Sequence, residues 1–309
     1  MIVRPPATRW VRPLLMAVAS GVATLGCWAF FVDTEQGQRI DTLSYLGAQI
    51  GTERVTPTFE SILEVVSVSG LALVMVAVAL TALLRRRWLL ALEAAVVVAA
   101  ANISTRVLKY HVLDRPLLVD WEGLHHNTYP SGHTTAAASA MVAALLVAPR
   151  VLRSLVAVIG ATVMVVFGYG TLAARWHRPS DVVGAFLVCF TWAFAALAVS
   201  GLRERLLLSR LPRPRLRPAS RVVPTLMLLA GAFALAVAGL CAHRVWDITG
   251  IFVTTRAEQL TSYLGGAAGI CGVAFTGMGL LLRGVQKTDL LAEDAGRHAE
   301  TWADEYHSE

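Results

Sequence analysis

The feature that most constrains this chain is a series of apolar runs, each close to the ~20 residues that cross a bilayer as an α-helix. There are eight: 13–32, 65–84, 88–105, 134–149, 154–174, 182–202, 222–243 and 260–282. Of the 309 residues, 56% are hydrophobic and 16% are charged, whereas about a quarter are charged in a soluble domain. The sequence therefore predicts an all-α, polytopic integral membrane protein with eight spans.

Basic residues indicate how these spans are oriented. Of the 27 basic residues, 18 lie in segments that an even number of spans places on one side of the membrane, together with both termini. By the positive-inside rule this side is cytoplasmic. A net charge of +6 could suggest a nucleic-acid partner, but in so apolar a chain it indicates topology instead. We expect a multi-pass protein of the cell membrane whose partners are membrane lipids, with no nucleic acid.

Composition divides the chain into four parts. We expect a six-span core at 1–205, a basic cytoplasmic linker at 206–221, two additional spans at 222–283 and an acidic cytoplasmic tail at 284–309. Glu93 is ionisable within a predicted span, which indicates either a function or a side chain that reaches back to the cytoplasmic surface. Thr42–Gly47 and Thr261–Gly265 have similar sequences, but they are too short to indicate a repeat.

Three polar stretches collect at the other, extracytoplasmic face. They are Lys109–Pro116 after the third span, Pro130–His133 before the fourth and His177–Asp181 between the fifth and sixth. The fourth and fifth spans are both long enough to cross the membrane at 1.5 Å per residue, so the chain returns to the face that it left. The three stretches are therefore predicted to meet at one depth.

These residue types suit a phosphoryl group. Ser131 is a good N-cap for the fourth span, and Gly132 lets backbone N–H groups approach an anion at a helix N-terminus. Lys109 and Arg115 can neutralise non-bridging oxygens.

Two histidines supply the reactive groups. Asp181 follows His177 by four residues, so in a helical turn its carboxylate can hold one ring nitrogen and leave the other free to attack. His133 can serve as the general acid for the leaving oxygen.

The set resembles the type 2 phosphatidic acid phosphatase superfamily of membrane phosphatases, which carries a Lys…Arg-Pro stretch, a Pro-Ser-Gly-His stretch and a Ser-Arg…His-x-x-x-Asp stretch on a six-helix core. The resemblance covers roughly residues 1–205. It implies a phosphohistidine on His177, oriented by Asp181, with His133 as the acid. It also implies that Lys109, Arg115, Ser131 and Gly132 hold the phosphate, and that no metal or other cofactor takes part.

The chain departs from the family pattern at two places. Five residues, not six, separate Lys109 from Arg115. The arginine expected six residues before His177 is Thr171, preceded by Gly170 where the pattern has serine. We expect Arg175 to supply the missing charge, because it would lie on the same face if the fifth helix continues that far. Arg178 is the alternative.

The sequence thus favours hydrolysis of a lipid phosphate or pyrophosphate at the extracytoplasmic face. Candidate substrates are an isoprenyl pyrophosphate, phosphatidic acid and phosphatidylglycerol phosphate. The alternatives are a lipid phosphotransferase, or a catalytically silent scaffold that binds lipid head groups. A transporter is disfavoured because the sequence shows no convincing inverted repeat.

Lysine usage generates a first prediction. Only Lys109 and Lys287 are lysines, in a chain that otherwise uses arginine. If Lys109 holds phosphate as a compact charge, Lys109→Arg lowers turnover of a lipid phosphate, because the guanidinium has a different shape. Lys287→Arg, in the cytoplasmic juxtamembrane segment, is the matched control and leaves turnover unchanged. Equal turnover in the two variants would contradict a specific role for Lys109.

Overall fold

The computed structural model describes residues 10–50, 76, 80, 88–119, 126–208, 220–248 and 254–288. Every long regular element in these residues is a helix, as the sequence predicts. The elements are α1 (Val11–Phe31), α2 (Glu35–Gln49), α5 (Trp88–Val107) with a π-helical turn η2 (Leu108–Val112), α6 (Gly132–Val147), α7 (Arg153–Ala173), α8 (Pro179–Leu208), α9 (Val222–Arg244) and α10 (Arg256–Thr288).

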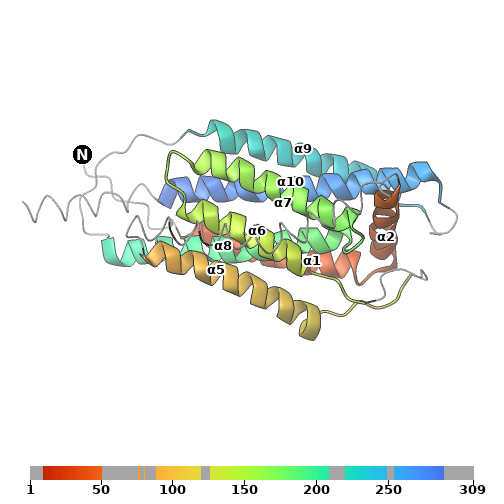
Figure 1. Cartoon of the computed structure of the whole chain (residues 1–309), viewed down its shortest axis with the longest axis horizontal. Coiled ribbons are helices and arrows are strands. Elements are labelled where there is room, and N and C mark those ends of the chain that lie inside the picture. The colour runs from red at the N-terminus through yellow and green to blue at the C-terminus, as the bar shows by residue number, and fades with distance from the viewer. Residues whose placement is uncertain are drawn as a thin grey trace, which may run out of the picture.

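Seven of the predicted spans coincide with helices that run side by side along the long axis of the molecule (Figure 1). Among the described residues, six helices are long and apolar enough to cross a membrane. The remaining one, α6, is a shorter apolar helix. The predicted span at 65–84 lies outside the described residues, apart from two isolated positions. The multi-pass architecture is confirmed.

Helix α2 differs from the others and lies across one end of the bundle (Figure 1). Its sequence is polar, and the Thr34 hydroxyl caps its start by accepting the Gly37 N–H at 3.0 Å. At this end α1, α7 and α9 finish and α6, α8 and α10 begin, so the three polar stretches also lie here. We call it the site end.

The two C-terminal helices are integrated into the bundle. Ile270, Ala274 and Met278 of α10 are buried in the same apolar core as Phe186 and Phe190 of α8. Helix α10 packs against α2, α7, α8 and α9. The helices beyond the predicted six-span core therefore share its hydrophobic interior.

Helix α10 also holds α2. The Ser44 hydroxyl donates to the Ser262 carbonyl at 2.6 Å, and the Ser262 hydroxyl donates to the Ile40 carbonyl at 2.8 Å. Gly47 packs directly against the Gln259 backbone. The two similar sequences Thr42–Gly47 and Thr261–Gly265 are thus the two sides of one helix crossing.

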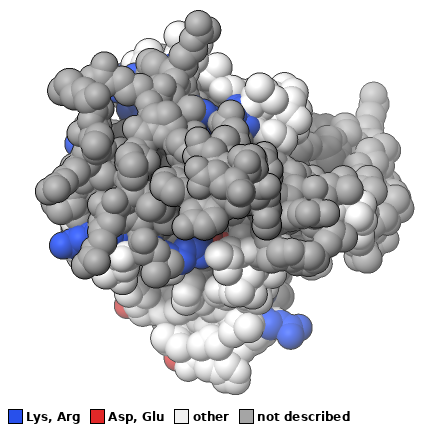
Figure 2. Space-filling view, turned by 90° about the vertical axis from the view of Figure 1, so that its left-hand side faces the viewer, with Lys and Arg blue, Asp and Glu red and all other residues white. Residues whose placement is uncertain are grey.

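The opposite end of the bundle carries many of the predicted cytoplasmic cations. Figure 2 looks onto this end and shows described Lys and Arg side chains around it. Arg153 is buried here and donates to the Ala148 carbonyl at 3.0 Å and to the Val285 carbonyl at 3.2 Å. The guanidinium thereby ties the α6–α7 connection to the end of α10.

Glu93 is held within the bundle by partners on α8. Its carboxylate lies 3.1 Å from Arg203 and accepts the Ser200 hydroxyl at 2.8 Å. Because a charge inside a bundle is stable only when it is paired, the ion pair accounts for this residue as a link between α5 and α8. Glu93 and its partners lie far along α5 and α8 from the site end.

The α2–α10 crossing generates a second prediction. A Cβ added at Gly47 overlaps the Gln259 carbonyl, whereas one added at Gly239 meets nothing within 4 Å. Gly47→Ala therefore forces α2 away from α10 and lowers the thermal midpoint of unfolding in detergent. This loss exceeds the gain in helix propensity of up to about 1 kcal/mol that comes from replacing glycine. Gly239→Ala, the control on α9, keeps or raises the midpoint. A Gly47→Ala protein as stable as Gly239→Ala would show that this packing is wrong.

Candidate active site

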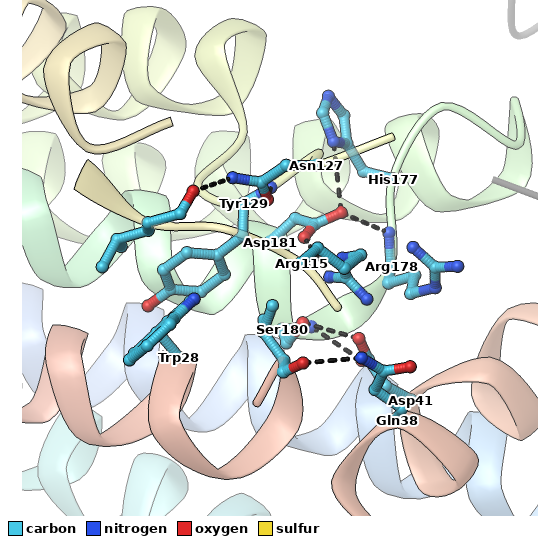
Figure 3. A network of polar contacts seen from close by, with 12 residues as sticks. Trp28, Gln38, Asp41, Arg115, Asn127, Tyr129, His177, Arg178, Ser180 and Asp181 are labelled. Carbon is cyan, nitrogen blue, oxygen red and sulfur yellow. Dashed lines mark hydrogen bonds and ion pairs between the residues drawn. The ribbon is translucent and has the colours of Figure 1, made fainter. Parts of the chain in front are cut away.

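The site is organised around Asp181 in the first turn of α8 (Figure 3). Its side chain is fully buried. One oxygen, Oδ2, accepts the Arg178 backbone N–H at 2.9 Å and lies 3.4 Å from Nδ1 of His177. The spacing of four residues thus produces the predicted His–Asp pair, because Pro179 starts the helix between the two side chains.

Arg115 forms an ion pair with the other oxygen of Asp181. Its Nη2 lies 3.3 Å from Oδ1, and its side chain is only 3% exposed. The loop that carries Arg115 is shaped by Asn127, whose amide donates to the Lys109 carbonyl at 3.0 Å and to the Leu113 carbonyl at 2.6 Å. A buried charge is stable only when paired, so Arg115 and Asp181 depend on each other.

The Pro-Ser-Gly-His stretch joins the same cluster through its backbone. The Ser131 N–H donates to the Asp181 carbonyl at 3.0 Å, and the Ser131 hydroxyl accepts the Thr134 N–H at 3.3 Å. The predicted N-cap of α6 is confirmed. Gly132 is exposed, with open space where a side chain would stand. The start of α6 is therefore accessible to a ligand.

His133 and Lys109 lie at the edge of the cluster. The His133 ring is 5.4 Å from the Trp176 ring, and burial and then the neighbouring His177 and Lys109 lower the pKa of His133. Lys109 is in the π-helical turn η2, with its amine 5.6 Å from the centre of the Tyr110 ring. Two histidines and two cations from three separate stretches are thus assembled at one end of the bundle.

Residues 90–205 match the family model described as the PAP2 superfamily. This match supports the resemblance to the type 2 phosphatidic acid phosphatase superfamily that the three polar stretches indicate. The match begins in α5, ends in α8 and contains all three polar stretches. Comparisons with curated proteins and with solved structures gave no match. The PAP2 match supports a phosphatase that acts on phosphate esters.

The structure distinguishes between the two arginines, Arg175 and Arg178, that could replace the arginine of the PAP2 pattern missing at Thr171. The assignment of Arg175 depended on α7 continuing that far, and this condition is not met. The helix ends at Ala173, and the Thr171 carbonyl accepts the N–H groups of Trp176 and His177. Arg175 has a left-handed backbone, with φ of 61°, and an exposed side chain. This turn redirects the chain before it reaches His177.

The Arg178 residue is 4% exposed, and its backbone N–H contacts Asp181 (Figure 3). Burial and the neighbouring Arg115 lower its pKa, whereas Asp181 and Asp41 raise it. The guanidinium therefore lies near the charges of Arg115, Asp181 and Asp41. Sequence spacing did not select Arg178, because only the fold of the α7–α8 turn shows that this residue is buried whereas Arg175 is exposed.

Sequence reasoning missed a further acid, Asp41 of α2. Its Oδ1 accepts the Ser180 N–H at 3.0 Å and its Oδ2 accepts the Ser180 hydroxyl at 2.6 Å. One turn earlier, the Gln38 amide donates to the Pro116 carbonyl at 2.6 Å, next to Arg115. Helix α2 lies outside the residues matched by PAP2, and no motif marks either side chain. Only the fold brings them to the site.

The His–Asp pair generates a third prediction. Asp181→Asn removes the charge that holds His177 and Arg115, so we expect kcat for a phosphate ester to fall by about 10²–10⁴-fold. Asp114→Asn is the matched control in the Arg115 loop, because its side chain is exposed. Steady-state kinetics on both purified variants checks this. Wild-type kcat in Asp181→Asn would contradict the central place of this carboxylate.

Proposed function

We propose that the protein is a metal-independent phosphatase that hydrolyses a lipid phosphate or pyrophosphate at the extracytoplasmic face through a phosphohistidine. The observation that carries the proposal is the buried Asp181 carboxylate, which lies between His177 and Arg115 at the start of α8. A histidine held at Nδ1 presents Nε2 as a nucleophile, with guanidinium groups beside it for the phosphate oxygens.

The reaction then has two steps. Nε2 of His177 attacks phosphorus, a P–N bond forms, and the bond between phosphorus and the leaving oxygen breaks as His133 donates a proton to that oxygen. In the second step, water attacks phosphorus and gives a proton back to His133. The P–N bond breaks, and inorganic phosphate leaves. The exposed position of His133 in the first turn of α6 suits exchange with a leaving group or with water.

Cations and a helix end supply the electrostatic stabilisation. We assign the phosphate oxygens to Arg115, Arg178 and Lys109, with the N-terminus of α6 at Ser131 and Gly132 as a further anion-binding element. This replaces Arg175 by Arg178 as the substitute for the missing PAP2 arginine. With protein cations in these positions, neutralisation of the phosphate needs no metal.

The position of the site suggests a lipid substrate. It lies where apolar helices end, so a substrate can keep its tail in lipid while its head group meets the cations. The arginine distribution supports an extracytoplasmic position for this end and a cytoplasmic position for both termini. Isoprenyl pyrophosphates, phosphatidic acid and phosphatidylglycerol phosphate all have this form.

One observation favours the alternative of a silent lipid-binding protein, and that is the loss of the PAP2 arginine at Thr171. Against it, the nucleophile, the orienting carboxylate and the acid are all present at one end of the bundle. Transfer of the phosphoryl group to an acceptor other than water is a variant that uses the same residues.

The arginine assignment generates a fourth prediction. Arg178→Ala removes a buried cation beside Arg115, so kcat falls by about 10²–10³-fold, the size of effect seen when one donor to a transition-state oxyanion is removed. Arg175→Ala, three residues earlier and exposed, keeps kcat within about twofold. The opposite ranking of the two variants in steady-state kinetics would instead favour Arg175 as the replacement for the missing arginine.

The function itself is tested by phosphate release. Purified protein is given a panel of lipid phosphates and a water-soluble phosphate ester, with and without a chelator, beside His177→Ala. We expect release from at least one lipid, insensitive to chelator and absent in His177→Ala. No release from any lipid by the wild type would favour the binding protein, and loss of activity with chelator would contradict the metal-free mechanism.

A further inference from the structure

The acid on α2 is in direct contact with the first turn of α8. Asp41 is 2% exposed, and both of its oxygens accept hydrogen bonds from Ser180, the residue before Asp181 (Figure 3). The carboxylate therefore caps the start of α8 in the way that an acidic side chain stabilises a helix N-terminus. It acts across 139 residues of sequence.

Four buried charges meet here and balance one another. Asp41 and Asp181 are acidic, and Arg115 and Arg178 are basic. Asp41 faces Arg178, Ser180 and Asp181 from α8 and its preceding loop, and Arg115 from the loop before α6. Among the described residues, Cys27 and Tyr129 are further titratable neighbours of Asp41. With both acids ionised, the net charge of the four groups is zero.

A bound phosphate upsets this balance. Its negative charge at the guanidinium groups adds to those of two carboxylates in a poorly hydrated place, where like charges repel strongly. A proton taken by Asp181 would break its contact with His177, whereas Asp41 has no histidine partner among the described residues. Asp41 is thus the acid that can be neutralised while the nucleophile stays oriented.

We propose that Asp41 is a positioning residue that fixes the first turn of α8 and takes up one proton from solvent when a phosphate group binds at Arg115 and Arg178. The inference rests on the proposed function and extends it to an acid outside the residues matched by PAP2. When Asp41 is protonated, its O–H group can donate to the Ser180 hydroxyl, because a hydroxyl can accept as well as donate.

The titration of Asp41 supports this assignment. Burial and then Asp181 raise the pKa of Asp41 to about 6, while Arg115, Arg178 and the Ser180 hydroxyl act in the lowering direction. A bound anion offsets the two arginines, so the pKa rises further in the complex. Protonation of Asp41 therefore raises the affinity for the anion. This gain is fully present below about pH 6 and is lost as the pH rises through the higher pKa of the complex.

The test uses sulfate, which stays a dianion over the range of interest and so does not itself titrate. Its affinity for the full-length protein in detergent is measured by calorimetry from about pH 5.5 to about pH 8.5. Because binding requires Asp41 to take up a proton, wild-type affinity falls by up to about tenfold per pH unit above about pH 6. Asp41→Asn, which mimics the neutral acid, has a shallower fall and binds sulfate more tightly than wild type at high pH.

Two further variants separate charge from structure. Ser44→Ala removes a hydrogen bond between α2 and α10 but no charge, and keeps the wild-type pH dependence. Ser180→Ala removes the hydroxyl that stabilises the ionised acid, so its fall in affinity moves to higher pH. If Asp41→Asn does not fold, the shift of the pH dependence in Ser180→Ala is the deciding measurement. Every variant keeps His133 and His177, so only differences between variants count.

The outcomes are distinct. A wild-type slope in Asp41→Asn, or an unmoved curve in Ser180→Ala, overturns the inference about Asp41 even if the enzyme is active. Sulfate binding with the expected slopes but no hydrolysis of any phosphate ester overturns the proposed function and leaves the proton-linked anion site. No sulfate binding by the wild type at any pH contradicts both.

Discussion

The structure of the site depends on the carboxylate of Asp181. Its side chain contacts His177, Arg115 and the Arg178 N–H, and its backbone carbonyl accepts the Ser131 N–H. One residue therefore joins three stretches that lie far apart in the sequence. Because the carboxylate is fully buried, each partner is needed to offset the cost of removing that charge from water.

Helix α2 provides a second layer beneath this carboxylate. Gln38 and Asp41 hold the backbone beside Arg115 and Asp181, and Ser44 fixes the helix to α10. A chain of contacts thus runs from α10 through α2 to the first turn of α8. Helix α10, which lies beyond the predicted six-span core, therefore has a physical role, because it supports the helix that positions the site.

The sequence predicts the local parts of the site well and the tertiary parts poorly. The spacing of His177 and Asp181 and the N-cap at Ser131 follow from helix geometry, and the structure confirms both. The end of α7 and the left-handed turn at Arg175 depend on how the chain packs, so spacing alone could not show that the helix stops before Arg175. Asp41 reaches the site only through its contacts with α8, which no local pattern encodes. The apolar runs predict the spans because hydrocarbon permits few other structures.

The most direct test of the phosphohistidine is to trap it. A substrate carrying labelled phosphorus is mixed with the protein and quenched with denaturant at alkaline pH, and the label on protein is counted. We predict an acid-labile, alkali-stable label on His177 of the wild type and none on His177→Ala. Hydrolysis by the wild type without any protein-bound label, or equal labelling of His177→Ala, would contradict the account.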